Sequence, residues 1–264
     1  MRALVLAAGI GKRLAPPTDD RPKGLIDLEG RSLLARLLDG LQAAGVAETA
    51  LVVGYRQEQI RAHLGTEHRG MTVRYLENPH YTQGPLLSLW TGRAEFERDD
   101  VLLADGDVLF APALLERVIR APEANAFLGE PDFVDTGEEQ NLYIAVPPHR
   151  KGTSDQGGGH VIAIRRGVMG PPDRLYESRA EWVGFVKVGR AAGIELAATL
   201  DAFVRDGRAE GDYERALDSL LPRHRFVACP TGGLPWIEID FAQDLQAAEG
   251  EVLPRIRALP GAAG

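Results

Sequence analysis

The first 23 residues combine a glycine-rich loop with several basic side chains. An apolar run over residues 3–8 predicts a buried strand, and the segment after it contains Gly9, Gly11, Lys12, Arg13 and, further along, Lys23. Glycines allow backbone N–H groups to approach phosphate oxygens closely, and nearby cations neutralise the phosphate charge. The combination predicts a polyphosphate-binding loop, although an ordinary turn after a strand would also use these glycines.

Two common phosphate-binding motifs do not fit this loop. The dinucleotide fingerprint requires a third glycine, and Leu14 stands at that position after Gly9 and Gly11. The P-loop of nucleoside triphosphatases requires Ser or Thr after its lysine, whereas Arg13 follows Lys12 here. A phosphate loop of another class is therefore expected.

Two acidic segments lie at the ends of apolar, strand-like runs. They are Asp105-Gly106-Asp107 and Glu238-Ile239-Asp240. Open α/β sheets bind ligands at the carboxyl ends of their strands, and Mg²⁺ prefers carboxylates together with phosphate oxygens. Both segments are therefore candidates for a metal site. A tight turn at residues 105–107 and a helix N-cap at Asp240 are the structural alternatives.

Strand-like and helix-like segments alternate along the chain. Strands are predicted at residues 3–8, 49–53, 72–76, 101–104, 142–146, 160–165, 181–188, 226–229 and 236–239. Helices are predicted at residues 32–44, 57–64, 85–96, 112–120, 191–205, 213–221 and 241–256. This order favours a single-domain α/β fold, Rossmann-like, with a mainly parallel mixed sheet flanked by helices.

The domain is expected to span residues 1–258, with a disordered tail at 259–264. Residues 129–172 are rich in Gly, Pro, Asp and His. The loop at 151–159 within this region is interpreted either as a lid or as a solvated hairpin loop.

Composition limits the classes of function. The chain has 264 residues and a net charge of −8, which argues against a nucleic-acid partner because such proteins need a basic surface. No stretch approaches the length of a membrane helix, so no membrane partner is expected. The single cysteine, Cys229, excludes an internal disulfide; it is expected to be a buried structural residue in a cytoplasmic protein.

The N-terminal motif resembles the signature of the nucleotidyltransferase (pyrophosphorylase) superfamily. The resemblance rests on Leu6-Ala7-Ala8-Gly9-Ile10-Gly11-Lys12-Arg13, then Thr18, then Pro22-Lys23. The superfamily includes sugar-1-phosphate nucleotidyltransferases and bacterial phosphocholine cytidylyltransferases. The resemblance implies that a phosphate monoester attacks the α-phosphorus of a nucleoside triphosphate and that pyrophosphate leaves. No general base is expected, because the nucleophile is already an anion near neutral pH.

The same resemblance implies roles for individual residues. Asp107 and Asp240 would hold Mg²⁺, Arg13 would stabilise the leaving pyrophosphate, and Lys23 would neutralise charge at the reacting phosphates. Residues of the loop, of the acidic turn and of a segment beside the nucleobase would bind the nucleotide: Leu6, Ala7, Ala8, Gly9, Gly11, Lys12, Arg13, Gln83, Gly84, Ser88, Asp105 and Gly106.

The C-terminal part resembles the phosphocholine and phosphonate cytidylyltransferase branch. The resemblance rests on residues 236–240 with Asp244-Leu245, and on Tyr213-Glu214. It implies CTP and a small amine-bearing phosphate or phosphonate as substrates. Aromatic faces and carboxylates would hold such a cation, although aromatic residues are often plain core; the candidates are Trp182, Tyr213, Glu214, Trp236 and Glu238.

Three other interpretations remain open. The chain could be a sugar-1-phosphate nucleotidyltransferase with the same catalytic residues, or a regulatory relative that only binds nucleotide. A molybdenum-cofactor-type transferase fits the C-terminal motif poorly. The sequence leaves the oligomeric state open, a homo-oligomer included.

Overall fold

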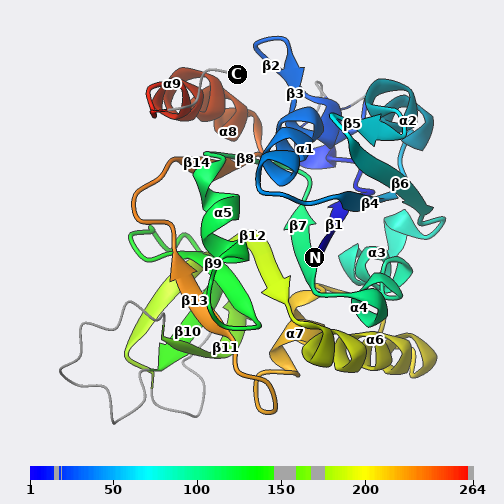
Figure 1. The fold of residues 1–264 in the computed structure, drawn as a ribbon, viewed down its shortest axis with the longest axis vertical. Coiled ribbons are helices and arrows are strands. Elements are labelled where there is room, and N and C mark those ends of the chain that lie inside the picture. The colour runs from blue at the N-terminus through cyan, green and yellow to red at the C-terminus, as the bar shows by residue number, and fades with distance from the viewer. Residues whose placement is uncertain (15–17, 19, 146–158, 168–175, 261–264) are drawn as a thin grey trace.

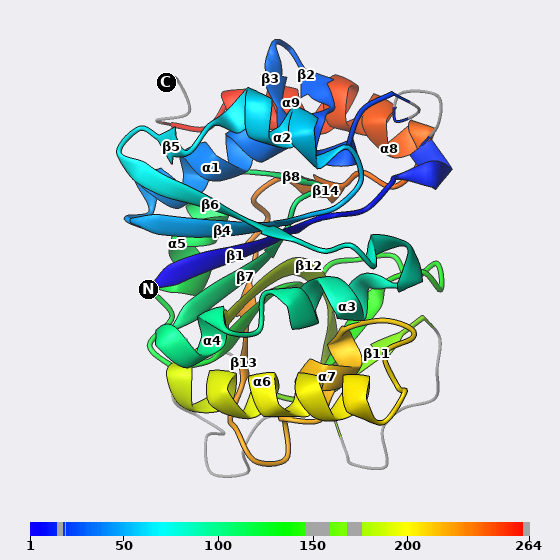
Figure 2. The ribbon, with the colours of Figure 1, turned by 90° about the vertical axis from the view of Figure 1, so that its right-hand side faces the viewer.

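A ten-stranded sheet forms the centre of the computed structural model, with helices on both of its faces (Figures 1 and 2). The structure describes residues 1–14, 18, 20–145, 159–167 and 176–260. The strand order is β10-β11-β13-β9-β12-β7-β1-β4-β6-β5. This architecture confirms the predicted α/β class with a mixed sheet.

One half of the sheet is parallel. Its strands are β1 (Arg2–Ala7), β4 (Glu48–Val53), β6 (Met71–Glu77) and β7 (Val101–Asp105). β1 lies between β4 and β7, and its inner residues are buried on both faces, which explains the continuous apolar run. The register pairs Leu6 with Asp105, so the glycine loop and the acidic turn leave the sheet side by side.

The other half of the sheet is largely antiparallel. The long strand β12 (Ser178–Val188) runs antiparallel to both β7 and β9, with an irregularity between Trp182 and Val186. The remaining strands of this half are β9 (Ala126–Glu130), β10 (Gln140–Ala145), β11 (His160–Arg166) and β13 (Val227–Pro230). Parallel pairing is thus concentrated on the N-terminal side, and β9–β13 is the parallel pair beyond it.

Short strands outside the alternating pattern complete the topology. β8 (Val108–Phe110) pairs antiparallel with β14 (Trp236–Glu238), and β2 (Asp27–Leu28) pairs with β3 (Arg31–Ser32). β5 (Glu67–His68) forms the edge beyond β6. The sequence did not predict β2, β3, β5, β8 or β9. The five residues of β9 lie between turn-rich segments, so no strand was predicted there.

Helices cover the two faces of the sheet (Figure 2). They are α1 (Leu33–Ala43), α2 (Gln57–Leu64), α3 (Pro85–Thr91), α4 (Glu95–Arg98), α5 (Ala113–Ile119), α6 (Arg190–Arg205), α7 (Glu214–Asp218), α8 (Ala242–Ala247) and α9 (Leu253–Arg257). The Ser32 side chain caps α1, accepting a hydrogen bond from the Ala35 N–H at 3.2 Å.

Two helices predicted as continuous are interrupted in the structure. The helix expected at residues 85–96 is interrupted at Gly92, whose backbone packs so tightly on Leu4 that a Cβ there would lie 2.6 Å from it. The helix expected at 241–256 contains a π-helical segment, Ala248–Val252, between α8 and α9. Both departures come from tertiary packing and local backbone geometry that periodicity does not report.

Several other expectations concern surface features. Cys229 is partly exposed rather than buried, because its strand β13 reaches the surface there. Loop residues 151–158 and tail residues 261–264 lie outside the described residues, and Leu259 packs against the core.

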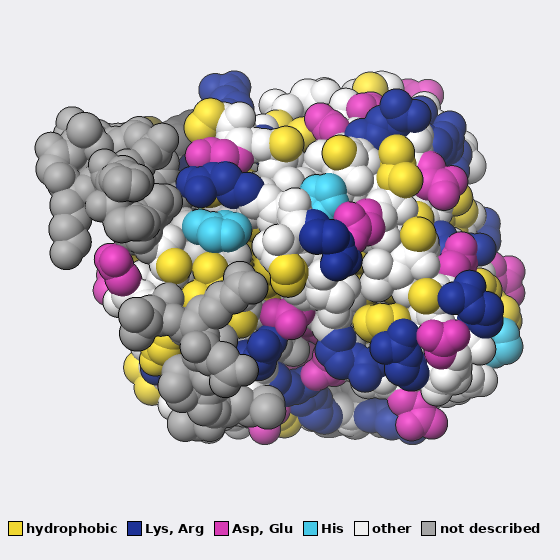
Figure 3. Space-filling view, turned by 90° about the horizontal axis from the view of Figure 1, so that it is seen from below, with side chains coloured by type: hydrophobic (Ala, Val, Ile, Leu, Met, Phe, Trp, Pro, Cys, Tyr) yellow, Lys and Arg dark blue, Asp and Glu magenta, His cyan; other side chains and the backbone are white. Residues whose placement is uncertain are grey.

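No helix in the described part of the chain is long and apolar enough to cross a membrane. On the face shown in Figure 3, Lys and Arg side chains are interspersed with Asp and Glu.

Candidate active site

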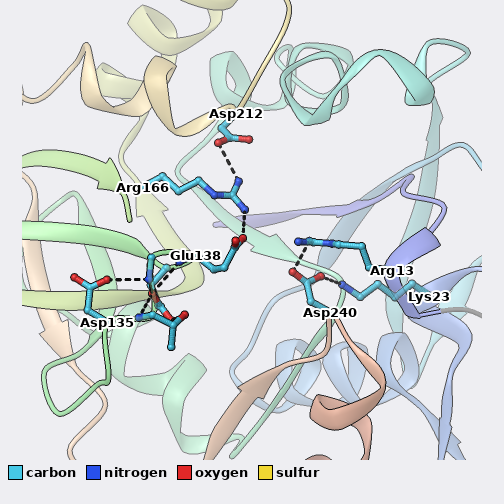
Figure 4. Close-up of polar contacts among 10 residues, drawn as sticks. Arg13, Lys23, Asp135, Glu138, Arg166, Asp212 and Asp240 are labelled. Carbon is cyan, nitrogen blue, oxygen red and sulfur yellow. Dashed lines mark hydrogen bonds and ion pairs between the residues drawn. The ribbon is translucent and has the colours of Figure 1, made fainter. Parts of the chain in front are cut away.

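A lysine and two aspartates form the centre of the candidate site, and Figure 4 shows the lysine, Lys23, beside one of them, Asp240. Lys23 Nζ donates hydrogen bonds to Asp107 Oδ2 at 2.7 Å and to Asp240 Oδ1 at 2.5 Å. Asp107 lies in the turn between β7 and β8, and Asp240 follows β14. The β8–β14 pair therefore brings two acidic segments together that are far apart in the sequence, and the Ile239 N–H donates to Asp107 O at 3.1 Å.

Lys23 is buried, and its side chain is 11% exposed. Burial alone would lower the pKa of its ammonium, but the charges of Asp107 and Asp240 outweigh it and raise the pKa above its usual range. Lys23 is therefore a permanent cation between two carboxylates.

Arg13 joins the same cluster from the glycine loop. Its Nη2 lies 2.5 Å from Asp240 Oδ2, and its guanidinium stacks over the Phe241 ring at 4.9 Å. About half of the side chain is exposed. Asp240 does not cap α8; the Asp244 carboxylate does so, accepting from the N–H groups of Asp240 and Phe241. The alternative N-cap role of Asp240 is thus wrong, and its carboxylate is directed to Arg13 and Lys23.

Glu238 lies with these aspartates. One oxygen from each of Asp107, Glu238 and Asp240 falls within 4.8 Å of the others. Asp107 Oδ1 is buried without a hydrogen-bond partner among the described residues. The Glu238 side chain is exposed, but partial desolvation by the surrounding protein and the charges of Asp107 and Asp240 raise the pKa of its carboxyl. Three clustered carboxylates with one orphaned oxygen fit a hard divalent cation such as Mg²⁺.

The glycine loop lies beside this cluster. Gly11 has a φ of +70°, and a Cβ there would lie 3.1 Å from both Lys23 Cβ and Thr18 Cγ2, so the loop requires glycine. The Thr18 hydroxyl donates to Gly11 O at 2.8 Å. Gly9 has open space around it, and Lys12 is exposed. This local packing holds the basic loop against Lys23.

The residues at the end of β1, just before the glycine loop, form backbone hydrogen bonds and core contacts. Leu6 O accepts from the Gly106 N–H at 3.0 Å, and Ala8 O accepts from the Tyr55 N–H at 3.1 Å. Ala7 packs on the core of the α1 face. A Cβ on Gly106 would lie 2.8 Å from Leu6 O, so the acidic turn can approach β1 only with glycine there.

The structure does not bring the expected nucleobase residues into one group. Gln83 is exposed, and its side chain contacts His80. Ser88 is buried and accepts from Asn78 Nδ2 at 3.1 Å, while Gly84 adopts a φ of +118° before α3. Pro85 lines the cleft described next, whereas these three residues do not.

A cleft of about 1240 Å³ extends from the Lys23 cluster along the antiparallel half of the sheet. Its described lining is strongly acidic. Twelve carboxylates line it, from Asp105, Asp107, Glu130, Asp132, Glu138, Glu139, Glu181, Asp212, Glu214, Glu238, Asp240 and Asp244. The guanidiniums in the same lining come from Arg13, Arg166 and Arg255.

The expected acceptor residues line this cleft, but the polar atoms of Tyr213 and Trp182 are already engaged. Tyr213 is buried, and its hydroxyl donates to the Asp105 carboxylate at 2.8 Å. Trp182 is buried edge-to-face against Tyr213, with ring centroids 5.7 Å apart, and its Nε1 donates to Phe185 O. Trp236 is partly exposed. Burial raises the pKa of Glu214 to about 7, and its Oε2 is buried without a hydrogen-bond partner among the described residues.

Sequence reasoning missed the acidic pair Glu130 and Glu181. The two residues are directly opposite each other on β9 and β12. Glu130 Oε2 accepts from Thr231 Oγ1 at 2.7 Å and from Trp236 Nε1 at 3.4 Å. Burial and the neighbouring carboxylates raise the pKa of Glu181 to about 7. The available signal was a glutamate between two apolar residues, Ala180 and Trp182, in a predicted strand.

Arg166 also went unnoticed in the sequence. It lies at the end of β11 and forms ion pairs with Asp212 at 3.1 Å and with Glu138 at 3.3 Å (Figure 4). These contacts join the segment before β10 to the segment before α7 across the cleft. The Arg166 charge is therefore shared between two carboxylates.

Comparison with known proteins gives the context of this geometry. The family model of the MobA-like NTP transferase domain matches residues 3–176. CMP-5'-(3-aminopropyl)phosphonate synthase of Streptomyces rubellomurinus is 47% identical over 127 residues, which are 48% of this chain and only 20% of that protein. A UTP–glucose-1-phosphate uridylyltransferase of Haloferax volcanii is 36% identical over 224 residues, covering 79% of this chain and 85% of that protein.

The solved structures support the same fold. CTP:phosphocholine cytidylyltransferase from Streptococcus pneumoniae superposes with a TM-score of 0.69 at 19% sequence identity, covering 94% of this chain and 97% of that one. At this identity the likeness shows the fold, and the family rests on the sequence matches. With its glycine loop and the three carboxylates beside it, the chain belongs to the MobA-like NTP transferase domain family and is a nucleotidyltransferase.

Proposed function

We propose that the protein transfers CMP from CTP to a small phosphonate or phosphate monoester that carries an amine, in a Mg²⁺-dependent reaction that releases pyrophosphate. A cytoplasmic location is part of this proposal. The observation that carries it is the acidic cleft that opens from the Lys23, Asp107 and Asp240 cluster. Such a surface attracts a compact cation and disfavours an acceptor with additional negative charge.

In this proposal the site residues neutralise the charge of the phosphates and align the reacting groups. Backbone N–H groups of residues 8–11 would hold the triphosphate, and Arg13 would bind the departing pyrophosphate with its planar guanidinium. Lys23 would contact the reacting phosphates. Asp107, Glu238 and Asp240 would hold the divalent ion, which when bound supplies positive charge to the phosphate oxygens.

The bond changes are simple. An oxygen of the acceptor phosphonate or phosphate forms a bond to the α-phosphorus of CTP, and the bond from that phosphorus to the β-phosphate oxygen breaks. The two products are the CMP-linked acceptor and pyrophosphate. The attacking oxygen is already anionic, so the site needs no base to remove a proton from it.

A sugar-1-phosphate acceptor is the second candidate function. It is favoured by the Haloferax volcanii uridylyltransferase, which matches over most of both chains. The Streptomyces rubellomurinus relative acts on an aminopropyl phosphonate according to its name, but it matches only about half of this chain. The choice between the two candidates therefore depends on the acceptor side of the cleft.

The test is a pyrophosphate-release assay over a matrix of substrates. CTP, UTP, TTP and GTP are each combined with 2-aminoethylphosphonate, phosphocholine and glucose-1-phosphate, with Mg²⁺ or with EDTA. We expect the highest kcat/KM for CTP with an amine-bearing acceptor, and no turnover in EDTA. A clear preference for a sugar phosphate would replace the proposed acceptor, and full activity in EDTA would refute the metal requirement.

A further inference from the structure

Two of the three carboxylates that could bind a metal already contact a cation of the protein itself. Lys23 Nζ contacts one oxygen of Asp107 and one oxygen of Asp240. These residues supply two of the three carboxylates in the candidate metal group. The ammonium and a divalent ion would therefore use the same pair of side chains.

Simultaneous occupation of both positions is unfavourable. Mg²⁺ binds carboxylate oxygens at about 2.0–2.1 Å and keeps a compact octahedral shell. An ammonium hydrogen-bonded to the same carboxylates would lie within a few Å of that ion, and like charges at such distances repel strongly in a partly buried site. The buried, unpartnered Asp107 Oδ1 offers a divalent ion an oxygen that Lys23 does not use.

We propose that Lys23 and the divalent metal ion are alternative partners of Asp107 and Asp240, so that metal binding releases the Lys23 ammonium to the phosphates. This inference rests on the proposed function. The stem of Lys23 is fixed beside the glycine loop, because a Cβ on Gly11 would lie 3.1 Å from Lys23 Cβ. The end of the side chain therefore exchanges partners while its base stays next to the triphosphate-binding segment.

Metal affinity without nucleotide gives the first test. Mn²⁺ binding is measured by calorimetry for the wild type, Lys23→Met and the surface control Arg120→Gln, which removes one positive charge from a side chain that is 78% exposed. Removing a competitor must tighten binding, so Lys23→Met should bind Mn²⁺ about tenfold or more tightly, whereas Arg120→Gln should match the wild type. If Lys23 instead supports the metal site, Lys23→Met will bind Mn²⁺ equally or more weakly, and the proposal is wrong.

A second measurement uses the wild-type protein and does not depend on a variant that folds. The chain has four lysines, at positions 12, 23, 151 and 187, so the ¹⁵N spectrum of the lysine ammonium groups is simple. Saturation with Mg²⁺ should shift the Lys23 signal and speed its hydrogen exchange while the Lys187 signal stays in place. An unchanged Lys23 signal at saturating Mg²⁺ would overturn the exchange of partners.

Asp107→Asn separates failure of this inference from failure of the proposed function. If this variant binds Mn²⁺ as the wild type does, the metal site itself is wrong. If Asp107→Asn loses Mn²⁺ binding but Lys23→Met binds Mn²⁺ no more tightly than the wild type, the metal site stands and only the competition with Lys23 is rejected.

Discussion

The two ends of the cleft differ in how their carboxylates are paired. At the phosphate end, Asp107 and Asp240 are paired with Lys23 and Arg13. At the acceptor end, Glu130 and Glu181 face each other across paired strands. Like charges in such positions destabilise a sheet unless something compensates for them. The first end therefore carries its own counter-ions, and under the proposed function a positive charge on the acceptor would complete the second.

The largest expected effect tests the phosphate end. Asp107→Asn should reduce turnover by roughly a thousandfold, about 4 kcal/mol of activation barrier, because the metal loses a ligand and Lys23 loses a partner. Pyrophosphate release measures the loss, and circular dichroism checks the fold. Asp206→Asn, at the exposed end of α6, is the matched control and should retain normal turnover. Near-normal turnover of Asp107→Asn would show that the charge-paired end of the cleft takes no part in the reaction.

A medium effect tests the acceptor end. Glu181→Gln should lower kcat/KM for 2-aminoethylphosphonate about tenfold, about 1.4 kcal/mol, because the ammonium loses a carboxylate partner. The control acceptor is propylphosphonate, which has a methyl group in place of the ammonium group and should lose nothing. An equal loss with both acceptors would mean that Glu181 shapes the cleft without selecting charge.

A further prediction concerns stability and pH. Burial raises the pKa of Glu214 from its ordinary 4.5 to about 7, so the folded protein favours the protonated form. This contribution to stability is complete below pH 4.5 and is lost as the pH rises through about 7. The Tm of the wild type relative to Glu214→Gln should therefore fall between pH 5 and pH 8. The exposed Glu210→Gln control should keep a constant difference, and a constant difference for Glu214→Gln as well would contradict the assignment.

The same contrast explains what the sequence could predict. The structure brings Lys23 together with Asp107 and Asp240, two aspartates that follow strands, as the short local motifs suggested. Glu238 was grouped with the acceptor side, yet it lies in the carboxylate cluster, because the β8–β14 pairing that places it there is a long-range contact. Glu130 and Glu181 escaped notice for the same reason.

The fold shows a similar division. The parallel half was visible in the sequence because three of its strands, β1, β4 and β7, are buried on both faces and leave largely apolar runs. The antiparallel half contains β9, which turn-rich segments conceal. The interruption at Gly92 depends on contact with Leu4 from a distant strand, which no local pattern records.

The pairing of β8 with β14 has a consequence for the order in which the protein becomes competent during synthesis. The glycine loop, Lys23 and Asp107 leave the ribosome early, but Asp240 follows one of the last strands of the chain. A nascent chain that stops before β14 holds the phosphate loop without a complete carboxylate cluster. The carboxylate cluster is therefore complete only after β14 has paired with β8.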